Sequence, residues 1–135
     1  MNRLVIITLI LCLLILTGCG QEQTKSGVDT SMTTELWKGY VNEDQSLAEN
    51  FNITMECLKL IGIAHDGQPY VVILSGWFKC GDQLTVGCFD HGSGTIYLGN
   101  GGYDLVFCHE TIHWATGLGK ESHGSAYFTQ CESAL

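Results

Sequence analysis

Residues 105–131 read LVFCHETIHWATGLGKESHGSAYFTQC. The first half of this segment is apolar at helical spacing, which predicts a helix from Tyr103 to about Thr116. Within the helix, His109 and His113 are the ends of an HExxH motif. Side chains four residues apart lie on one helix face, so both imidazoles can reach a single Zn²⁺ ion. Glu110 follows the first histidine and can hold and deprotonate a zinc-bound water.

A catalytic zinc site needs a third protein ligand and an open fourth position. Gly117 and Gly119 allow the chain to end the helix and turn back, and His123 follows shortly afterwards. We therefore predict His123 as the third ligand of one Zn²⁺ ion per chain, with Glu121 as the alternative. A purely structural zinc site is disfavoured, because such sites usually have four protein ligands and prefer cysteine.

The segment from His109 to Cys131 resembles the SprT-like zincin peptidases. In that family, an HExxH helix is followed by a loop and then by an HGxxFxxxC motif that opens the next helix. Here residues 123–131 read HGSAYFTQC, with Tyr127 at the aromatic position and a short loop before the motif. The resemblance extends over residues 84–135 and is strongest over residues 105–131.

This resemblance implies a zincin fold, with His109, His113 and His123 as zinc ligands and Glu110 as the general base. Tyr127 has two open roles: it can stabilise the oxyanion of a tetrahedral intermediate or pack in the core, and packing is favoured. The metzincin and aspzincin patterns do not match, because their third ligands have no counterpart at the corresponding positions.

Other histidines and one cysteine near the motif have simpler interpretations. An HExxH helix can also occur without metal, with its glutamate capping a structural histidine. Cys108 projects about 100° away from His109 on a helix, so we expect it in the core or in a disulfide. His65 and His91 lie in turn-like contexts and are predicted to be solvated loop residues, with a place lining the cleft as the alternative for His91.

The N-terminus has the pattern of an export signal. Arg3 is followed by LVIITLILCLLIL, residues 4–16, which would be ~20 Å long as a helix and so shorter than the ~30 Å hydrocarbon core of a bilayer. A signal peptide is therefore favoured over a transmembrane anchor. Residues 16–19 read LTGC and resemble the bacterial lipobox. That resemblance implies transfer of diacylglycerol to the Cys19 thiol and cleavage just before it, with fatty acyl chains such as palmitate as the anchor.

These features predict a lipoprotein of the bacterial cell envelope, anchored by lipid to a membrane on its periplasmic or extracellular face. Three segments follow from this prediction: a signal peptide (1–18), a lipidated flexible tether (19–31) and a metallopeptidase-like domain (32–135).

The chain has seven cysteines, which indicates an oxidising compartment or metal chemistry. After processing, an odd number remains in the domain, which permits two disulfides and one free thiol. Cys80 and Cys88 flank a turn, where a disulfide would fit across a hairpin. The sequence alone assigns no pairing among these cysteines: Cys57, Cys80, Cys88, Cys108 and Cys131.

Apolar periodicity and turn residues predict an α+β domain. We expect a small zincin-like fold, in which a short antiparallel or mixed three-stranded sheet packs on the HExxH helix and flanking helices. Ser46 is the predicted N-cap of the first long helix, with Glu49 completing a capping box. The predicted segments are a short helix at 37–41, helices at 46–61, 103–116 and 125–135, and strands at 70–74, 84–89 and 95–98.

The charge balance excludes one class of partner. Six basic residues stand against 14 acidic ones, a net charge of −8, whereas binding to nucleic-acid phosphates needs clustered lysine and arginine. We therefore expect a protein or peptide substrate, a membrane contact through the lipid, and no nucleic acid.

Together these observations predict a zinc-dependent peptidase that hydrolyses peptide bonds of an envelope protein or peptide. Glu110 would activate the water, and an edge strand at Thr95–Leu98 would bind the substrate backbone. The alternative is a non-enzymatic lipoprotein that uses a zincin-derived domain to bind a partner. The small size of the domain, which leaves little room for a deep cleft, favours that alternative.

Overall fold

The computed structural model describes residues 27–100 and 103–132. The predicted signal peptide, Cys19 and the last three residues of the chain lie outside this part. The strands are β1 (Val28–Asp29), β2 (Glu35–Tyr40), β3 (Tyr70–Leu74), β4 (Phe78–Cys80), β5 (Gln83–Thr85), β6 (Gly87–Asp90) and β7 (Thr95–Gly99). The helices are α2 (Gln45–Leu60), α3 (Tyr103–Thr116) and α4 (Ala126–Cys131), with 3₁₀ turns η1 (Val41–Glu43) and η2 (Lys120–Ser122).

The strands of the described residues form two sheets, which confirms the α+β class. The larger sheet is mixed, in the order β2-β3-β7-β6, with β3 and β7 parallel at its centre. Its outer strands, β2 and β6, run antiparallel to their neighbours. The smaller sheet is antiparallel, in the order β1-β4-β5. The predicted three-stranded sheet is thus replaced by a four-stranded mixed sheet and a separate three-stranded one.

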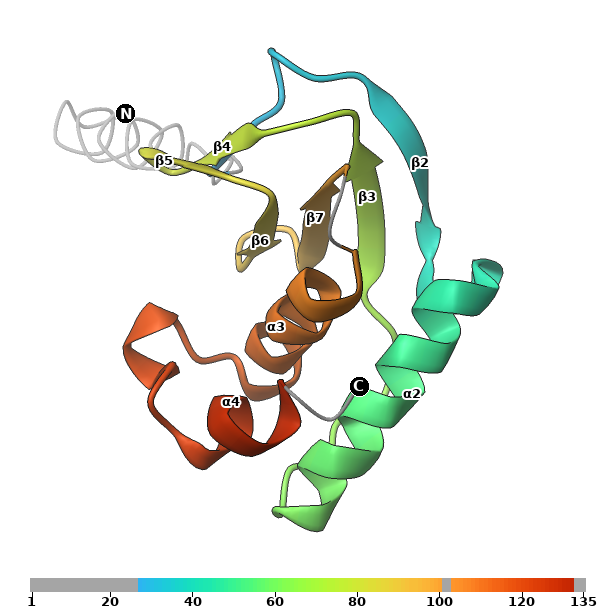
Figure 1. Ribbon diagram of the computed structural model, residues 1–135, viewed down its shortest axis with the longest axis vertical. Coiled ribbons are helices and arrows are strands. Elements are labelled where there is room, and N and C mark those ends of the chain that lie inside the picture. The colour runs from blue at the N-terminus through green and yellow to red at the C-terminus, as the bar shows by residue number, and fades with distance from the viewer. Residues whose placement is uncertain (1–26, 101–102, 133–135) are drawn as a thin grey trace, which may run out of the picture.

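The two sheets and the helices form layers (Figure 1). Alternate residues of the central strands face opposite sides, as strand geometry requires. Val71, Ile96 and Leu98 pack towards the helices, whereas Val72 and Leu74 pack towards Phe78 of the small sheet. The helices therefore cover one face of the large sheet, and the small sheet covers part of the other face.

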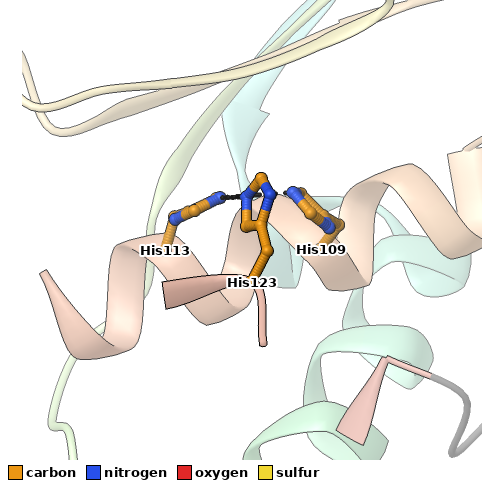
Figure 2. A group of neighbouring side chains, drawn as sticks. All are labelled: His109, His113 and His123. Atoms are coloured by element: carbon orange, nitrogen blue, oxygen red, sulfur yellow. Dashed lines mark hydrogen bonds between the residues drawn. The ribbon is translucent and has the colours of Figure 1, made fainter. Parts of the chain in front are cut away.

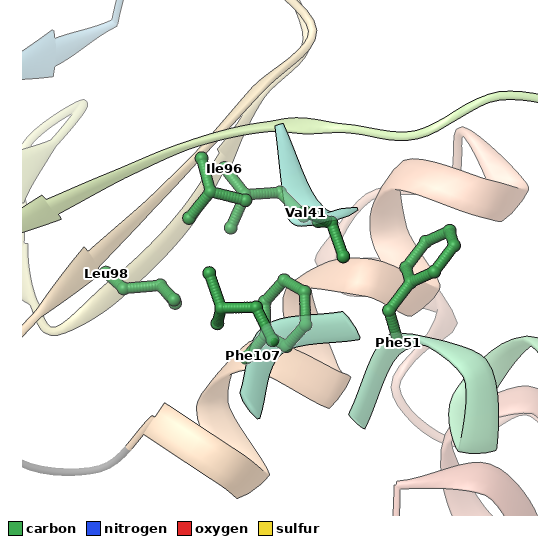
Figure 3. Close-up of a cluster of buried hydrophobic side chains, with 7 residues drawn as sticks. Val41, Phe51, Ile96, Leu98 and Phe107 are labelled. Carbon is green, nitrogen blue, oxygen red and sulfur yellow. The ribbon is translucent and has the colours of Figure 1, made fainter. Parts of the chain in front are cut away.

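Helices α2 and α3 lie side by side against the large sheet, and their apolar residues close the main core (Figures 1 and 3). Phe51 of α2 and Phe107 of α3 meet Ile96 and Leu98 of β7 in this core. A second cluster joins the C-terminal half of α3 to α2 and α4. Its buried members are Leu58, Ile112, Ala115, Phe128 and Cys131. These two clusters fix α3 as the central helix.

The predicted helix at 103–116 is confirmed, and the helix predicted at 46–61 is found one residue earlier. Asp44, not Ser46, is its N-cap, since the Asp44 carboxylate accepts a hydrogen bond from the Leu47 N–H at 2.9 Å. The helix ends where Gly62 adopts φ +94°, and the Gly62 N–H donates to the Lys59 carbonyl at 3.1 Å.

One helix prediction and two strand predictions need correction. The predicted helix at 37–41 is wrong, because residues 35–40 form β2 and pair with β3. The predicted strand at 84–89 is divided between the two sheets, because the Thr85 hydroxyl bonds the backbone of Gly87 and turns the chain. The predicted edge position of residues 95–98 is also wrong, because β7 is paired on both sides. The edge strand on that side of the sheet is β6.

Two disulfides connect these layers. Cys80 and Cys88 are bonded, although their disulfide joins β4 of the small sheet to β6 of the large sheet rather than two strands of one hairpin. Cys57–Cys131 joins α2 to α4. Cys108 is free and fully buried, which confirms a core role for it. In the described part of the chain, no helix is both long and apolar enough to span a membrane.

The two disulfides are expected to contribute unequally to stability. They close chain segments of 74 and eight residues, for which the loop-entropy model gives about 4.5 and about 2.5 kcal/mol. Urea unfolding should therefore show a larger loss of unfolding free energy in Cys57→Ser/Cys131→Ser than in Cys80→Ser/Cys88→Ser. Equal losses in the two double variants would contradict the loop-length argument.

Candidate metal centre

Helix α3 presents two of the predicted ligands at the edge of the large sheet. From Phe107 to His113 every residue of the helix is buried except His109, which is half-buried. A helix enclosed in this way carries apolar residues on most sides, so its polar residues stand out as exceptions. His109 and His113 are one turn apart on the face that lies beside β6.

The third predicted ligand reaches the same face because the chain reverses after α3. Gly117 adopts φ +67°, and its N–H donates to the carbonyl of His113 at 2.9 Å, which ends the helix. The short turn η2 follows, and its last hydrogen bond runs from the His123 N–H to the Lys120 carbonyl at 3.4 Å. This turn brings His123 back against α3, as the sequence predicted.

The three imidazoles converge through their Nε2 atoms (Figure 2). Nε2 of His113 lies 3.2 Å from Nε2 of His109 and 3.0 Å from Nε2 of His123. Three nitrogens bound to one zinc ion at tetrahedral angles would lie about 3.3 Å apart, given bonds of about 2.05 Å. The two distances from His113 fit a common ion, and all three ligand atoms lie within 4.8 Å of one another, close enough to bind one.

Hydrogen bonds on the opposite ring nitrogens determine which tautomer two of the rings adopt. Nδ1 of His113 lies 2.6 Å from the Leu118 carbonyl, and Nδ1 of His109 lies 2.8 Å from Oε1 of Glu132. A carbonyl or carboxylate oxygen can only accept, so each Nδ1 must carry the hydrogen. In the neutral rings, both Nε2 lone pairs then point into the cluster, which is the arrangement of metal-binding histidines.

Burial keeps the central ring in the form that binds metals. It lowers the pKa of His113, and the neighbouring His109 and His123 lower it further, against the opposing hydrogen bond to Leu118. The neutral imidazole is therefore favoured. Facing lone pairs at 3.0 and 3.2 Å would repel one another, and a cation bound between them would relieve that repulsion.

Glu110 is a buried carboxylate beside this cluster. Burial raises its pKa to about 7, although the charge of His109 and a hydrogen bond to the backbone of Phe89 act in the opposite direction. It belongs to the wall of the pocket that holds all three histidines. A carboxylate with this pKa can both take up and release a proton near neutral pH.

Strand β6 comes close to Glu110 because residue 87 is a glycine. A Cβ atom at Gly87 would lie 2.9 Å from Oε1 of Glu110 and would clash with the side chain of Val106. Any larger residue there would displace the carboxylate or the strand. The absence of a side chain at Gly87 thus permits the close packing of edge strand and helix at the centre.

The histidines lie on a pocket of about 250 Å³ between α3, β6 and the turn before His123. His91 and Lys120 also line it, so His91 takes the place on the cleft that was the alternative to a solvated loop position. Their positions depend on how the β6–β7 turn and η2 fold against α3. Sequence spacing carried no signal for Lys120 or Glu132.

The other residues that the sequence singled out are not members of the cluster. The exposed Glu121 accepts a hydrogen bond from the Gly119 N–H at 2.9 Å, and His123 is the third member of the cluster. Tyr127 packs against the second core cluster, which agrees with the favoured packing role. The ring of His65 contacts the ring of Trp114 at a tilt of 48°, with centroids 4.0 Å apart.

Comparisons with known proteins add no relative. No protein-family model matches this chain, and no curated protein and no solved structure matches it significantly. The resemblance to SprT-like peptidases therefore stays a prediction from the motifs.

Proposed function

We propose that this protein is a zinc-dependent peptidase of the bacterial cell envelope, held at a membrane by lipid on Cys19. The observation that supports it most strongly is the convergence of three histidines beside a buried glutamate, with Nε2 of His113 lying 3.2 and 3.0 Å from the other two Nε2 atoms. Three protein ligands that leave a fourth position open are typical of catalytic zinc, whereas structural sites usually have four. Within the described residues, no fourth histidine, cysteine or carboxylate joins this cluster.

When bound, zinc would supply a Lewis acid that polarises a peptide carbonyl and lowers the pKa of water. His109, His113 and His123 would hold the ion through Nε2. Glu110 would take a proton from the attacking water at its carboxylate and then give that proton to the leaving amine. Its pKa of about 7 suits both steps near neutral pH.

The substrate backbone is proposed to lie along β6, in place of the strand at 95–98 that the sequence predicted. β6 is the last strand of its sheet, so one of its edges is not paired within that sheet. Three of its residues, Gly87, Cys88 and Phe89, line the pocket that holds the histidines. An extended peptide that added to this edge would pass directly over Glu110.

Zinc binding is the first expected property. The purified chain should hold one zinc ion per molecule after dialysis, measured by elemental analysis, and His123→Ala should lose it. Zinc at 100 times its dissociation constant should also raise the unfolding free energy by about 2.7 kcal/mol. His65→Ala, which changes a histidine outside the cluster, is the matched control and should keep the metal. A folded chain that takes up no zinc would refute the proposal.

Catalysis is tested separately with Glu110→Gln. Cleavage of fluorescently labelled casein and of a quenched peptide library should fall at least ~10²-fold, because the general base is lost. Zinc content and the unfolding midpoint should stay as in the wild type. Glu56→Gln, at an exposed position of α2, should leave cleavage unchanged. If the zinc-loaded wild type cleaves nothing, the non-enzymatic binding module becomes the better explanation.

A further inference from the structure

The carboxylate of Glu132 contacts one of the three cluster histidines from outside the cluster. Its Oε1 lies 2.8 Å from Nδ1 of His109, across 23 residues of sequence. Glu132 directly follows the last residue of α4, and its side chain is about two-fifths exposed. The HExxH motif and the histidine at 123 do not predict this contact, because it depends on where α4 docks.

His109 is oriented by a residue far away in the sequence, Glu132, whereas His113 is oriented by a residue close to it in the sequence. The Nδ1 atom of His113 is held by the Leu118 carbonyl, five residues further along the same chain reversal. Among the described residues, His109 has no comparable local partner: its other ring contacts are with His113, His123 and Phe128, with centroids 4.7–4.9 Å apart. Within this part of the chain, the hydrogen bond to Glu132 alone fixes its tautomer.

Helix α4 is held in place by two contacts. Phe128 is buried in the second core cluster and packs against the rings of the cluster histidines. Cys131, the residue before Glu132, is bonded to Cys57 in the last turn of α2. A helix of six residues is too short to be stable alone, so these two contacts determine where Glu132 lies.

On the basis of the metal site of the proposed function, we propose that Glu132 is the positioning residue of His109. The Cys57–Cys131 disulfide holds Glu132 in that position. The carboxylate accepts the Nδ1 hydrogen, so Nε2 of His109 keeps its lone pair directed at the metal. The negative charge also raises the electron density of the ring, which strengthens binding to a cation. The affinity of the centre for metal thus depends on a disulfide outside it.

The first experiment measures zinc affinity in the full chain by competition with a chromophoric chelator. Glu132→Ala should weaken binding roughly 10- to 100-fold, as expected when a carboxylate partner of a ligand histidine is lost. Glu132→Gln should recover part of this loss, since its amide oxygen still accepts the Nδ1 hydrogen. Glu56→Ala removes an exposed carboxylate next to Cys57 and should leave the affinity unchanged.

Two further readouts separate positioning from general stability. The visible absorption bands of the Co²⁺-substituted chain should shift in Glu132→Ala, because the geometry at the ion changes. The unfolding midpoint of the metal-free chain should stay the same in this variant. A fall in that midpoint with unchanged cobalt bands would overturn the proposal and assign Glu132 a purely structural role.

The second experiment tests the disulfide with a double-mutant cycle. Cys57→Ser/Cys131→Ser should weaken zinc binding, and adding Glu132→Ala to it should weaken binding no further, because both changes act through the same contact. Additive losses would overturn the part assigned to the disulfide. If the serine variant does not fold, the comparison of Glu132→Ala with Glu132→Gln still decides the part assigned to Glu132.

The outcomes distinguish this inference from the proposed function. A wild-type chain that binds no zinc refutes the metal centre itself, and the role of Glu132 with it. A wild-type chain that binds zinc with the same affinity as Glu132→Ala leaves the metal centre standing and refutes only the positioning role.

Discussion

The enclosure of helix α3 is the constraint on which the rest of this structure depends. The helix packs on the large sheet through Phe107, on α2 through the same core, and on α4 through Ile112. Such a helix cannot rotate or shift without opening two core clusters, and close-packed interiors resist that change. The bonds from the backbone to the side chains of His109, Glu110 and His113 therefore point in fixed directions. A metal centre needs this rigidity, because its ligands must meet within a few tenths of an ångström.

The sequence predicted best those features that depend on short-range patterns. The helix at 103–116, its two histidines and the return of His123 follow from spacing and from Gly117, and the structure has all of them. Predictions failed where tertiary contacts decide. Residues 35–40 became a strand because β3 offers a pairing edge, and β7 became an inner strand because the chain crosses over to place β6 outside it. Glu132 could not be found from spacing, since only the docking of α4 brings it to His109.

The two disulfides lie on the two sides of the centre. Cys80–Cys88 ties β6, the strand beside Glu110, to the small sheet, whereas Cys57–Cys131 ties α4, the helix before Glu132, to α2. A domain of this size buries a limited apolar surface, and cross-links add stability that such a core lacks. Here each cross-link also fixes an element that carries a wall of the site. The same two covalent bonds thus stabilise the domain and fix the geometry of the site.

A purely structural role for the histidine cluster does not explain why Glu110 is buried beside it. Its carboxylate is 7% exposed, and no lysine or arginine in the described part of the chain forms an ion pair with it. Burying an ionisable group without such a partner costs stability, which is why its pKa rises to about 7. A metal held by the three histidines would need no further structural ligand from it. Buried ionisable groups with shifted pKa values gather at catalytic sites, because proton transfer near neutral pH requires them. The burial of Glu110 therefore supports the proton-transfer role proposed for it.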